Sequence, residues 1–139
     1  MPTRSSEATW EGSLQQGSGS MELGSGMFSG EYSFVTRFGD EDGTNPEELI
    51  AAAHAGCYAM ALSGALGEEG YEPERIHAKA HVHLDDDSLS IDRITLEVEA
   101  TVPDIDEETF LEIANEAKAG CPVSKVLAGA EIRLDATLV

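Results

Sequence analysis

Residues 44–57 read TNPEELIAAAHAGC, and this stretch contains the clearest helix start in the chain. Asn45 is a favourable N-cap residue, Pro46 suits the first helical position, and Glu48 completes the spacing of a capping box. The apolar run continues to about Leu66. Because this helix is apolar on nearly every side, we expect it to lie in the interior of the protein.

The uncharged run from Leu49 to Gly67 approaches the length of a membrane span. It is dominated by Ala and Gly rather than Leu and Ile, so its insertion into lipid would be weakly driven. Gly67 and Gly70 supply the end signals of a helix. At the N-terminus no apolar segment typical of a signal peptide follows the first residues. We therefore expect a buried central helix, no membrane association and a cytoplasmic location.

The segments after this helix predict two strands, a helix and a final strand. Residues 76–84 and 94–102 alternate apolar and polar side chains around a turn at 85–88, as an antiparallel pair of half-buried strands does. Asp106 caps a helix that ends at Gly120 and carries an apolar stripe. The apolar stripe consists of Phe110, Ile113, Ala114 and Ala117. A short helix is expected at residues 122–127, and the last strand at residues 132–138.

The Gly- and Ser-rich residues 1–30 indicate either a flexible tail or strands joined by loose turns. Taken with the later elements, the order is strands, helix, two strands, helix and strand. That order predicts an α+β protein rather than an alternating parallel sheet. The length of 139 residues fits one domain, so residues 1–139 are expected to form a single unit.

The charge of the chain is strongly acidic, with 27 Asp and Glu against 8 Lys and Arg, for a net charge of -19. Such a surface cannot neutralise phosphates, which argues against a nucleic-acid partner and against an anionic membrane. Self-repulsion would destabilise the fold at low salt and would be screened at high salt. The composition therefore suggests a halophile-like acidic surface, although an ordinary acidic protein has the same signature.

Only two cysteines are present, and each is either an inert core residue or a chemical group. Cys57 falls within the apolar helix, where burial raises a thiol pKa and a nearby cation would be needed to form the thiolate. Cys121 precedes Pro122 at the expected start of a short helix, where free N–H groups favour a thiolate. The sequence leaves open whether the two sulfur atoms can meet.

Arg37 lies among apolar neighbours just before the central helix. It is either a surface arginine in a strand or the partner of a carboxylate, facing a thiolate together with it. Glu47 is free for that role because Glu48 fits the capping box. Ten residues of helix separate Glu47 from Cys57 by roughly 15 Å, so a partnership needs Arg37 as a bridge, a bent helix or a second subunit.

A metal site is the weaker interpretation of the histidines. His54 and Cys57 form an H-x-x-C pair, and His81 and His83 share one strand face. A structural zinc site needs four convergent ligands, usually including a C-x-x-C pair, and the sequence has no such pair. Solvent-facing histidines on a strand are the simpler explanation, so no metal and no cofactor are expected.

Residues 44–57 closely resemble the first cysteine motif of the OsmC/Ohr family, the osmotically inducible and organic hydroperoxide resistance proteins. Residues 117–124, AKAGCPVS, resemble the second motif, and residues 10–12 and 36–38 match N-terminal signatures of the family. The likeness covers essentially the whole chain. The features more similar to the OsmC branch than to the Ohr branch are His54 and residues 120–123.

This resemblance implies an α+β fold in an intertwined homodimer, with antiparallel sheets wrapped around central helices and active sites at the subunit interface. It implies strands, rather than a tail, in the N-terminal segment. Four catalytic residues are implied by position: Cys57 is the peroxidatic cysteine, Cys121 the resolving cysteine, and Arg37 and Glu47 the charged pair beside the reactive thiol.

The activity implied is thiol-dependent reduction of organic hydroperoxides. The Cys57 thiolate attacks the peroxide, an alcohol leaves, and the resulting sulfenic acid condenses with Cys121 to a disulfide. A dithiol reductant, of lipoyl type in this family, restores both thiols. We expect an apolar substrate pocket beside Cys57, with Phe38, Tyr58 and Met60 as candidate lining residues. The alternative is a non-enzymatic, stress-induced binding or structural protein with inert buried thiols.

Overall fold

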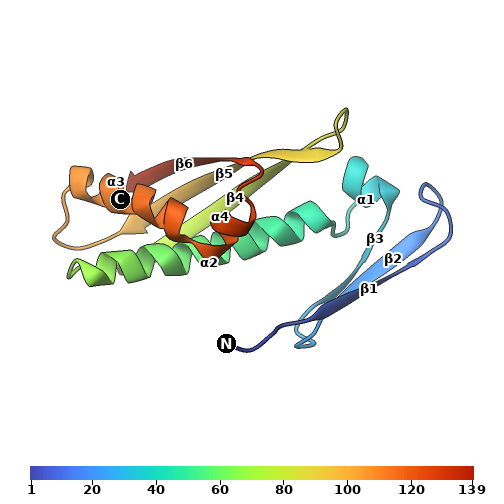
Figure 1. Ribbon diagram of the computed structural model, residues 1–139, viewed down its shortest axis with the longest axis horizontal. Helices are drawn as coiled ribbons and strands as arrows, with labels where there is room; N and C mark the ends of the chain where they lie inside the picture. The colour runs from blue at the N-terminus through green and yellow to red at the C-terminus, as the bar shows by residue number, and fades with distance from the viewer. The chain divides into compact units, whose positions relative to one another are not determined.

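The computed structural model describes residues 1–139 and contains six strands and four helices, in the order of three strands, two helices, two strands, two helices and a last strand (Figure 1). The chain forms two units, residues 1–49 and residues 50–139, each with its own three-stranded sheet. The secondary-structure content is α+β, as predicted, and the long helices and strands follow one another in the predicted order.

The first unit contains an antiparallel sheet made from the Gly- and Ser-rich segment. Its strands are β1 (Ser6–Glu11), β2 (Ser18–Leu23) and β3 (Ser29–Tyr32), in the order β1-β2-β3. Gly19 on β2 lies against the rings of Trp10 and Tyr32, whose centroids are 5.4 Å apart. A Cβ atom at Gly19 would approach both rings to 2.6 Å, so only glycine fits there. The segment is therefore a sheet and not a tail.

A short helix follows this sheet and carries Arg37. Helix α1 spans Phe34–Phe38, and Ser33 caps it through a reciprocal capping box with Thr36. The interpretation of this segment as a strand is therefore wrong. The apolar pattern around Arg37 was too short to distinguish a strand from one turn of helix, and the capping signal of Ser33 and Thr36 decides the structure.

Helix α2 spans Pro46–Glu68, with Asn45 at its N-cap as predicted. The Asn45 side chain accepts a hydrogen bond of 2.8 Å from the backbone N–H of Glu48. The Glu48 carboxylate accepts from the hydroxyl of Thr44 at 2.9 Å instead of closing the capping box. The helix ends two residues later than Leu66, beyond Gly67, and Gly70 then takes a positive φ of 88° in the turn that follows.

The second unit contains a mixed sheet of strands β4 (Arg75–Asp85), β5 (Ser90–Thr101) and β6 (Glu131–Leu138). Strands β4 and β5 form the predicted antiparallel pair. Strand β6 runs parallel to β5, so the expectation of purely antiparallel sheets is wrong at this one pair. The physical reason is the connection: two helices between β5 and β6 carry the chain back along the sheet before the last strand begins.

The two connecting helices lie on the apolar side of this sheet. Helix α3 spans Glu107–Gly120 and is capped by Asp106, and helix α4 spans Pro122–Val126 with Cys121 at its N-cap. The predicted stripe of α3 is buried, together with the apolar face of β5 and one face of α2. The residues of this core include Tyr58, Leu62, Leu66, Leu96, Val98, Phe110, Ile113, Ala114, Ala117 and Cys121.

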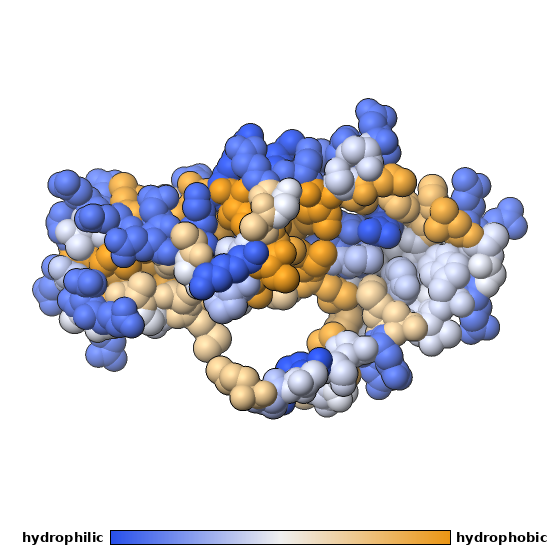
Figure 2. Space-filling view, viewed as in Figure 1, coloured by the Kyte–Doolittle hydropathy of each residue, from blue (hydrophilic) through white to orange (hydrophobic).

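The opposite face of α2 is exposed. Met60 is 79% exposed, and the neighbouring positions of that face are small. The expectation that this helix is interior on all sides is therefore wrong for the single chain. By length and composition α2 is also long and apolar enough to cross a membrane, with 22% of that apolar window buried. Figure 2 shows apolar surface gathered around the middle of the second unit, where α2 and α4 lie in Figure 1.

Candidate active site

The two cysteines meet in the second unit. Cys57 lies on the covered face of α2, and Cys121 lies at the junction of α3 and α4. Their sulfur atoms are 2.9 Å apart, and both thiols are free. Cys121 is fully buried, whereas Cys57 is partly accessible. The more accessible sulfur can therefore meet a reagent first, with the second sulfur already beside it.

The hydrogen bonds around the two sulfur atoms are unequal. Burial raises the pKa of Cys57, the hydrogen bond to Cys121 raises it further, and a single backbone N–H, from Val123, opposes both. Burial also works against ionisation of Cys121, but its contact with the Cys57 sulfur and hydrogen bonding from Ser124 and Val123 outweigh burial and lower the pKa of Cys121. Within the second unit, the pKa of Cys121 is thus lowered while that of Cys57 is raised.

A buried polar pair adjoins the cysteines. The Nε2 atom of His54, on α2, lies 2.7 Å from the hydroxyl oxygen of Ser124, on α4, and both side chains are buried. One turn further along α2, the hydroxyl of Tyr58 donates to the carbonyl oxygen of Ala114 on α3 at 2.9 Å. These two hydrogen bonds fix α2 against the helices that carry Cys121.

In the first unit, Arg37 and Glu47 form a two-pronged ion pair. The Nε and Nη2 atoms of Arg37 donate to the two carboxylate oxygens of Glu47 at 3.0 and 2.9 Å. Glu47 is only 8% exposed, and the hydrogen bond to its carboxylate raises the pKa of Arg37. The predicted pairing of this arginine with this carboxylate is thus present, and the geometry is the one in which guanidinium recognises carboxylate best.

Aromatic side chains surround the Arg37 end of this unit. A pocket of about 470 Å³ is lined by Arg37 and by apolar groups. The apolar lining comes from Trp10, Leu14, Tyr32, Phe34 and Phe38. Tyr58 is fully buried in the core of the second unit and Met60 projects outward, so neither supports the expectation of a pocket lined by these two residues.

The remaining histidines are occupied on the outer face of the second sheet. His81 lies 3.0 Å from Glu97, and His83 lies 2.6 Å from Asp92, all four on exposed parts of β4 and β5. They are contacts between side chains on neighbouring strands, in agreement with the simpler interpretation of solvent-facing strand histidines. The Nε2 atom of His54 lies beside the hydroxyl of Ser124, and His54 does not belong to a cluster of three or more possible metal ligands.

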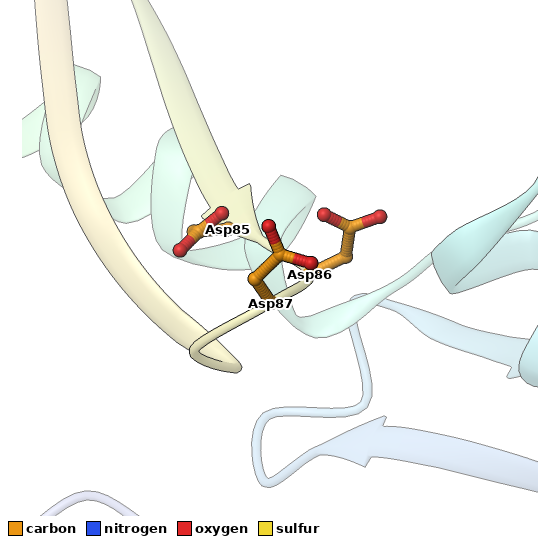
Figure 3. Close-up of side chains that lie close together, drawn as sticks. All are labelled: Asp85, Asp86 and Asp87. Atoms are coloured by element: carbon orange, nitrogen blue, oxygen red, sulfur yellow. The ribbon is translucent and has the colours of Figure 1, made fainter.

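Three consecutive aspartates at the β4–β5 turn bring their carboxylates together (Figure 3). They are Asp85, Asp86 and Asp87, and the latter two are exposed. Asp85 accepts from the hydroxyl and the N–H of Ser88 at 2.6 and 3.3 Å, and these bonds lower its pKa. The arrangement is that of a carboxylate closing a turn.

Sequence reasoning did not single out Ser124 as a functional residue. Its signals were weak: it is the third residue after Cys121, in the first turn of a short helix. His54 was considered as a metal ligand and as a mark of the OsmC branch, but not as a neighbour of the cysteines, although its position three residues before Cys57 places both on the same face of α2.

The family model for OsmC-like protein matches residues 39–136 of this chain. The chain belongs to the OsmC-like family. It is 52% identical to peroxiredoxin OsmC of Escherichia coli K12 over 132 residues, which is 93% of this chain and 92% of the relative. It is 32% identical to the organic hydroperoxide resistance protein OhrB of Bacillus subtilis over 90 residues, 64% of this chain and 65% of that protein. The higher identity to OsmC confirms the predicted branch.

Solved structures of OsmC-like proteins share the fold. An OsmC-like protein of unknown function from Vibrio cholerae has a TM-score of 0.76 at 16% identity, covering 99% of this chain and 100% of the other. The organic hydroperoxide resistance protein OsmC of Legionella pneumophila has a TM-score of 0.74 at 19% identity, covering 99% of both chains. These likenesses establish the OsmC-like fold, as predicted. A peroxidase-type function agrees with the names of the relatives.

Proposed function

We propose that this OsmC-like protein is a thiol-dependent peroxidase that reduces organic hydroperoxides through Cys57 and Cys121. The observation that carries the proposal is the contact of two free thiols at 2.9 Å, one partly accessible and one buried. A peroxidatic cysteine must be reached by substrate, and a resolving cysteine must reach the oxidised sulfur afterwards. Cys57 and Cys121 have these two properties in that order.

The reaction follows from the chemistry of thiols. The Cys57 thiolate attacks one oxygen of the hydroperoxide, the O–O bond breaks, and the alkoxide takes a proton and leaves as the alcohol. Cys57 is then a sulfenic acid. The sulfur of Cys121 displaces the hydroxyl of that group, which leaves as water, and a Cys57–Cys121 disulfide forms. A dithiol reductant restores both thiols by exchange.

The charged pair Arg37 and Glu47 has the role of activating Cys57. Burial raises the pKa of Cys57, so the thiolate needs a positive charge beside it. We propose that the guanidinium of Arg37 supplies this charge, and that the two bonds from Glu47 fix its orientation. In an intertwined homodimer, the Arg37 that faces a given Cys57 can come from the second subunit.

The aromatic pocket beside Arg37 suits an organic hydroperoxide. Its apolar walls, including Trp10 and Phe38, can bind a hydrocarbon group, and Arg37 can donate to the polar end. Hydrogen peroxide offers no apolar part to such walls. We therefore propose that the pocket favours organic hydroperoxides over hydrogen peroxide.

The partners we propose are a second copy of this chain and a dithiol reductant of lipoyl type. The small-residue face of α2 around Gly56 and Gly64 is open to close approach, and Met60 is exposed there. Covering this face in a homodimer would make the helix interior, as its composition predicts. Light scattering should give a dimer mass. The whole chain then acts as one OsmC-like domain, located in the cytoplasm.

The alternative is a non-enzymatic, stress-induced binding protein with inert thiols. One observation favours it: burial and the contact with Cys121 raise the pKa of Cys57, and a protonated thiol is a poor nucleophile. The two functions differ in what peroxide does to the thiols, so a single titration separates them.

The test is addition of cumene hydroperoxide to the reduced protein, followed by counting of free thiols and measurement of intact mass. The peroxidase loses two thiols per equivalent of peroxide and becomes about 2 Da lighter, because a disulfide forms and water carries away the oxygen. A protein with inert thiols keeps both thiols and its mass. The second result would refute the proposed function.

A further inference from the structure

Two side-chain contacts join helix α2 to the segment that begins α4. The sulfur atoms of Cys57 and Cys121 lie 2.9 Å apart. The Nε2 atom of His54 lies 2.7 Å from the hydroxyl oxygen of Ser124. On each side the two contact residues are three positions apart, about one turn of helix, and they follow one another in opposite directions. The two contacts are therefore successive links between the same two elements.

The backbone connects Ser124 firmly to Cys121. Cys121 is the N-cap of α4, and its carbonyl oxygen accepts a hydrogen bond from the N–H of Lys125 at 3.1 Å. The N–H of Cys121 donates to the carbonyl oxygen of Ala117, in the last turn of α3, at 3.0 Å. Three residues of helix rise only about 4.5 Å, within one hydrogen-bonded turn. A displacement of Ser124 away from α2 would therefore move the Cys121 sulfur as well.

Helix α4 has little else to hold it against α2. It is five residues long, far below the length at which a helix is stable by itself. Ser124 is its only buried residue, and Val126 is 79% exposed. Val123 packs against the core but is only partly buried. The bond to His54 is the side-chain hydrogen bond that joins α4 to α2.

Burial makes this hydrogen bond hard to break. His54 is 0% exposed and Ser124 is 5% exposed, so water cannot replace either partner while the helices stay packed. The Nδ1 atom of His54 has no partner, which leaves Nε2 as the one ring nitrogen that forms a hydrogen bond. A buried polar group without any partner destabilises the fold. Packing therefore favours the arrangement in which α4 stays beside α2.

We propose that His54 and Ser124 are positioning residues whose hydrogen bond keeps Cys121 within bonding reach of Cys57. This inference rests on the proposed function and concerns its second step. In that step the S–O bond of the Cys57 sulfenic acid breaks and an S–S bond to Cys121 forms. The hydroxyl group takes the proton of the Cys121 thiol and leaves as water. The Cys121 sulfur is oxidised and the Cys57 sulfur is reduced, so both reach the disulfide level and the electrons balance.

Positioning matters because this step is a reaction between two groups of one chain. Its rate depends on how often the two sulfurs lie in line at bonding distance, and a misplacement of about 1 Å can slow such a reaction about a hundredfold. Without the bond between His54 and Ser124, α4 would still be restrained by the backbone bonds of Cys121. We therefore expect a partial effect, about tenfold. The first step should change less, because Cys57 is placed by α2 itself.

The first experiment measures the proximity of the two thiols without peroxide. The protein is equilibrated with mixtures of reduced and oxidised glutathione, quenched with acid and alkylated after unfolding, so that intact mass counts buried thiols too. Movement of α4 weakens the disulfide, because it loosens the dithiol form more than the covalently joined form. Ser124→Ala should therefore lower the equilibrium constant for disulfide formation about tenfold, which corresponds to a reduction potential about 30 mV higher.

Three further variants separate positioning from loss of packing. His54→Leu keeps bulk but removes the hydrogen bond, whereas His54→Gln keeps a polar group that can reach Ser124. The equilibrium constant should fall about tenfold in His54→Leu and stay within about twofold of the wild-type value in His54→Gln. Ile94→Val removes buried packing from β5, outside the core cluster that contains Cys121, and should leave the constant unchanged.

An unchanged equilibrium constant in Ser124→Ala would overturn the proposal. Equal constants for folded His54→Gln and His54→Leu would overturn it too, because the hydrogen bond would then make no difference. A shift of the same size in Ile94→Val would do the same, since the effect would be one of general stability. If His54→Leu does not fold, Ser124→Ala and Ile94→Val still decide.

The second experiment measures the resolving step. Reduced protein receives one equivalent of cumene hydroperoxide, and the Cys57 sulfenic acid is trapped with dimedone at successive times. Ser124→Ala should lengthen the lifetime of the sulfenic acid about tenfold, with the rate of peroxide loss changed by less than about twofold. An unchanged lifetime would overturn the positioning role. If the wild-type protein loses no thiol to peroxide, the proposed function fails, whereas the glutathione equilibrium still supports or overturns the placement of Cys121 by His54 and Ser124.

Discussion

The sulfur atoms of Cys57 and Cys121 lie 2.9 Å apart, although 64 residues separate the two cysteines in the chain. The contact depends on the packing of α2 against α3 and α4 across one core. A disulfide has an S–S length of about 2.05 Å, so the two sulfurs need to approach by only about 1 Å. Oxidation of one sulfur therefore places it beside its resolving partner without a large rearrangement.

Substitution of each cysteine should give a different defect. Cys57→Ser should abolish consumption of cumene hydroperoxide, because the attacking sulfur is lost. Cys121→Ser should still consume the first equivalent and then accumulate sulfenic or sulfinic acid, visible as a gain of about 16 or 32 Da in intact mass. Full peroxide consumption by Cys57→Ser would show that another group carries the reaction.

Removal of the guanidinium of Arg37 should make Cys57 harder to ionise. An opposite charge within about 4–6 Å shifts a pKa by roughly one to three units. In the Cys121→Ser background, Arg37→Ala should therefore raise the midpoint of Cys57 alkylation by at least about one pH unit. Arg37→Lys keeps the charge but loses the two-pronged contact with Glu47, so its alkylation midpoint should lie between those of the proteins with Arg37 and with Arg37→Ala.

If the alkylation curves of the Cys121→Ser protein with Arg37 and with Arg37→Ala superimpose, Arg37 does not help to ionise Cys57. Folding must be checked in parallel, because Glu47 is 8% exposed and would lose its partner. Leaving such a carboxylate unpaired should cost roughly 1–3 kcal/mol of stability. The double change Arg37→Ala with Glu47→Gln is the matched control, since it removes both charges.

The hydroxyl of Tyr58 should contribute to stability rather than to chemistry. It donates to the carbonyl of Ala114 at 2.9 Å within the core. Tyr58→Phe leaves that carbonyl without this donor and should lower the free energy of unfolding by about 1–2 kcal/mol in urea. Tyr71→Phe, at a partly exposed position, should change it by less than about 0.5 kcal/mol. Equal losses in both variants would contradict a specific role for the Tyr58 bond.

Salt should stabilise this protein, because its net charge is -19. The Debye length falls from about 10 Å at 0.1 M to about 3 Å at 1 M salt, which screens the self-repulsion. Thermal unfolding should therefore shift to higher temperature in molar NaCl. The double variant Asp86→Asn, Asp87→Asn, in the aspartate cluster of Figure 3, should be more stable at low salt and respond less to added salt. A melting temperature independent of salt would contradict the electrostatic explanation.

Local patterns in the sequence predicted most of the secondary structure. The cap at Asn45, the alternation of β4 and β5, and the apolar stripe of α3 each depend on neighbouring residues, and the structure confirms them. A strand was one of the two interpretations offered for Arg37, because a run of five residues is too short for its periodicity to distinguish a strand from a helix. The cap formed by Ser33 and Thr36 was the signal that would have corrected it.

Contacts between segments that are distant in the sequence could not be predicted from local sequence patterns. The parallel pairing of β6 with β5 depends on where two helices return the chain, and no residue in β6 encodes that direction. The meeting of Cys57 with Cys121 was implied by family resemblance and not by spacing. The bond from His54 to Ser124 was not expected at all, since an H-x-x-C pair draws attention to metals and a serine after Cys-Pro is ordinary.

The buried imidazole of His54 should make stability depend on pH. Burial lowers its pKa in the folded state, whereas the unfolded chain titrates near 6.5. Just below that pH, His54 binds a proton in the unfolded state but not in the folded state. The stability due to neutral His54 is thus fully present above about pH 6.5 and is lost as the pH falls toward the lower, folded pKa.

His54→Gln should remove this dependence, because the amide does not titrate. The difference in free energy of unfolding between the two proteins should change by up to about 1.4 kcal/mol per pH unit just below pH 6.5, which is the slope for one proton. His77→Gln, on the exposed face of β4, is the matched control and should keep the wild-type slope. Urea unfolding between about pH 5 and pH 8 measures all three proteins. A His54→Gln slope equal to that of the wild type would mean that His54 binds protons equally in the folded and unfolded states, which would contradict a neutral buried imidazole.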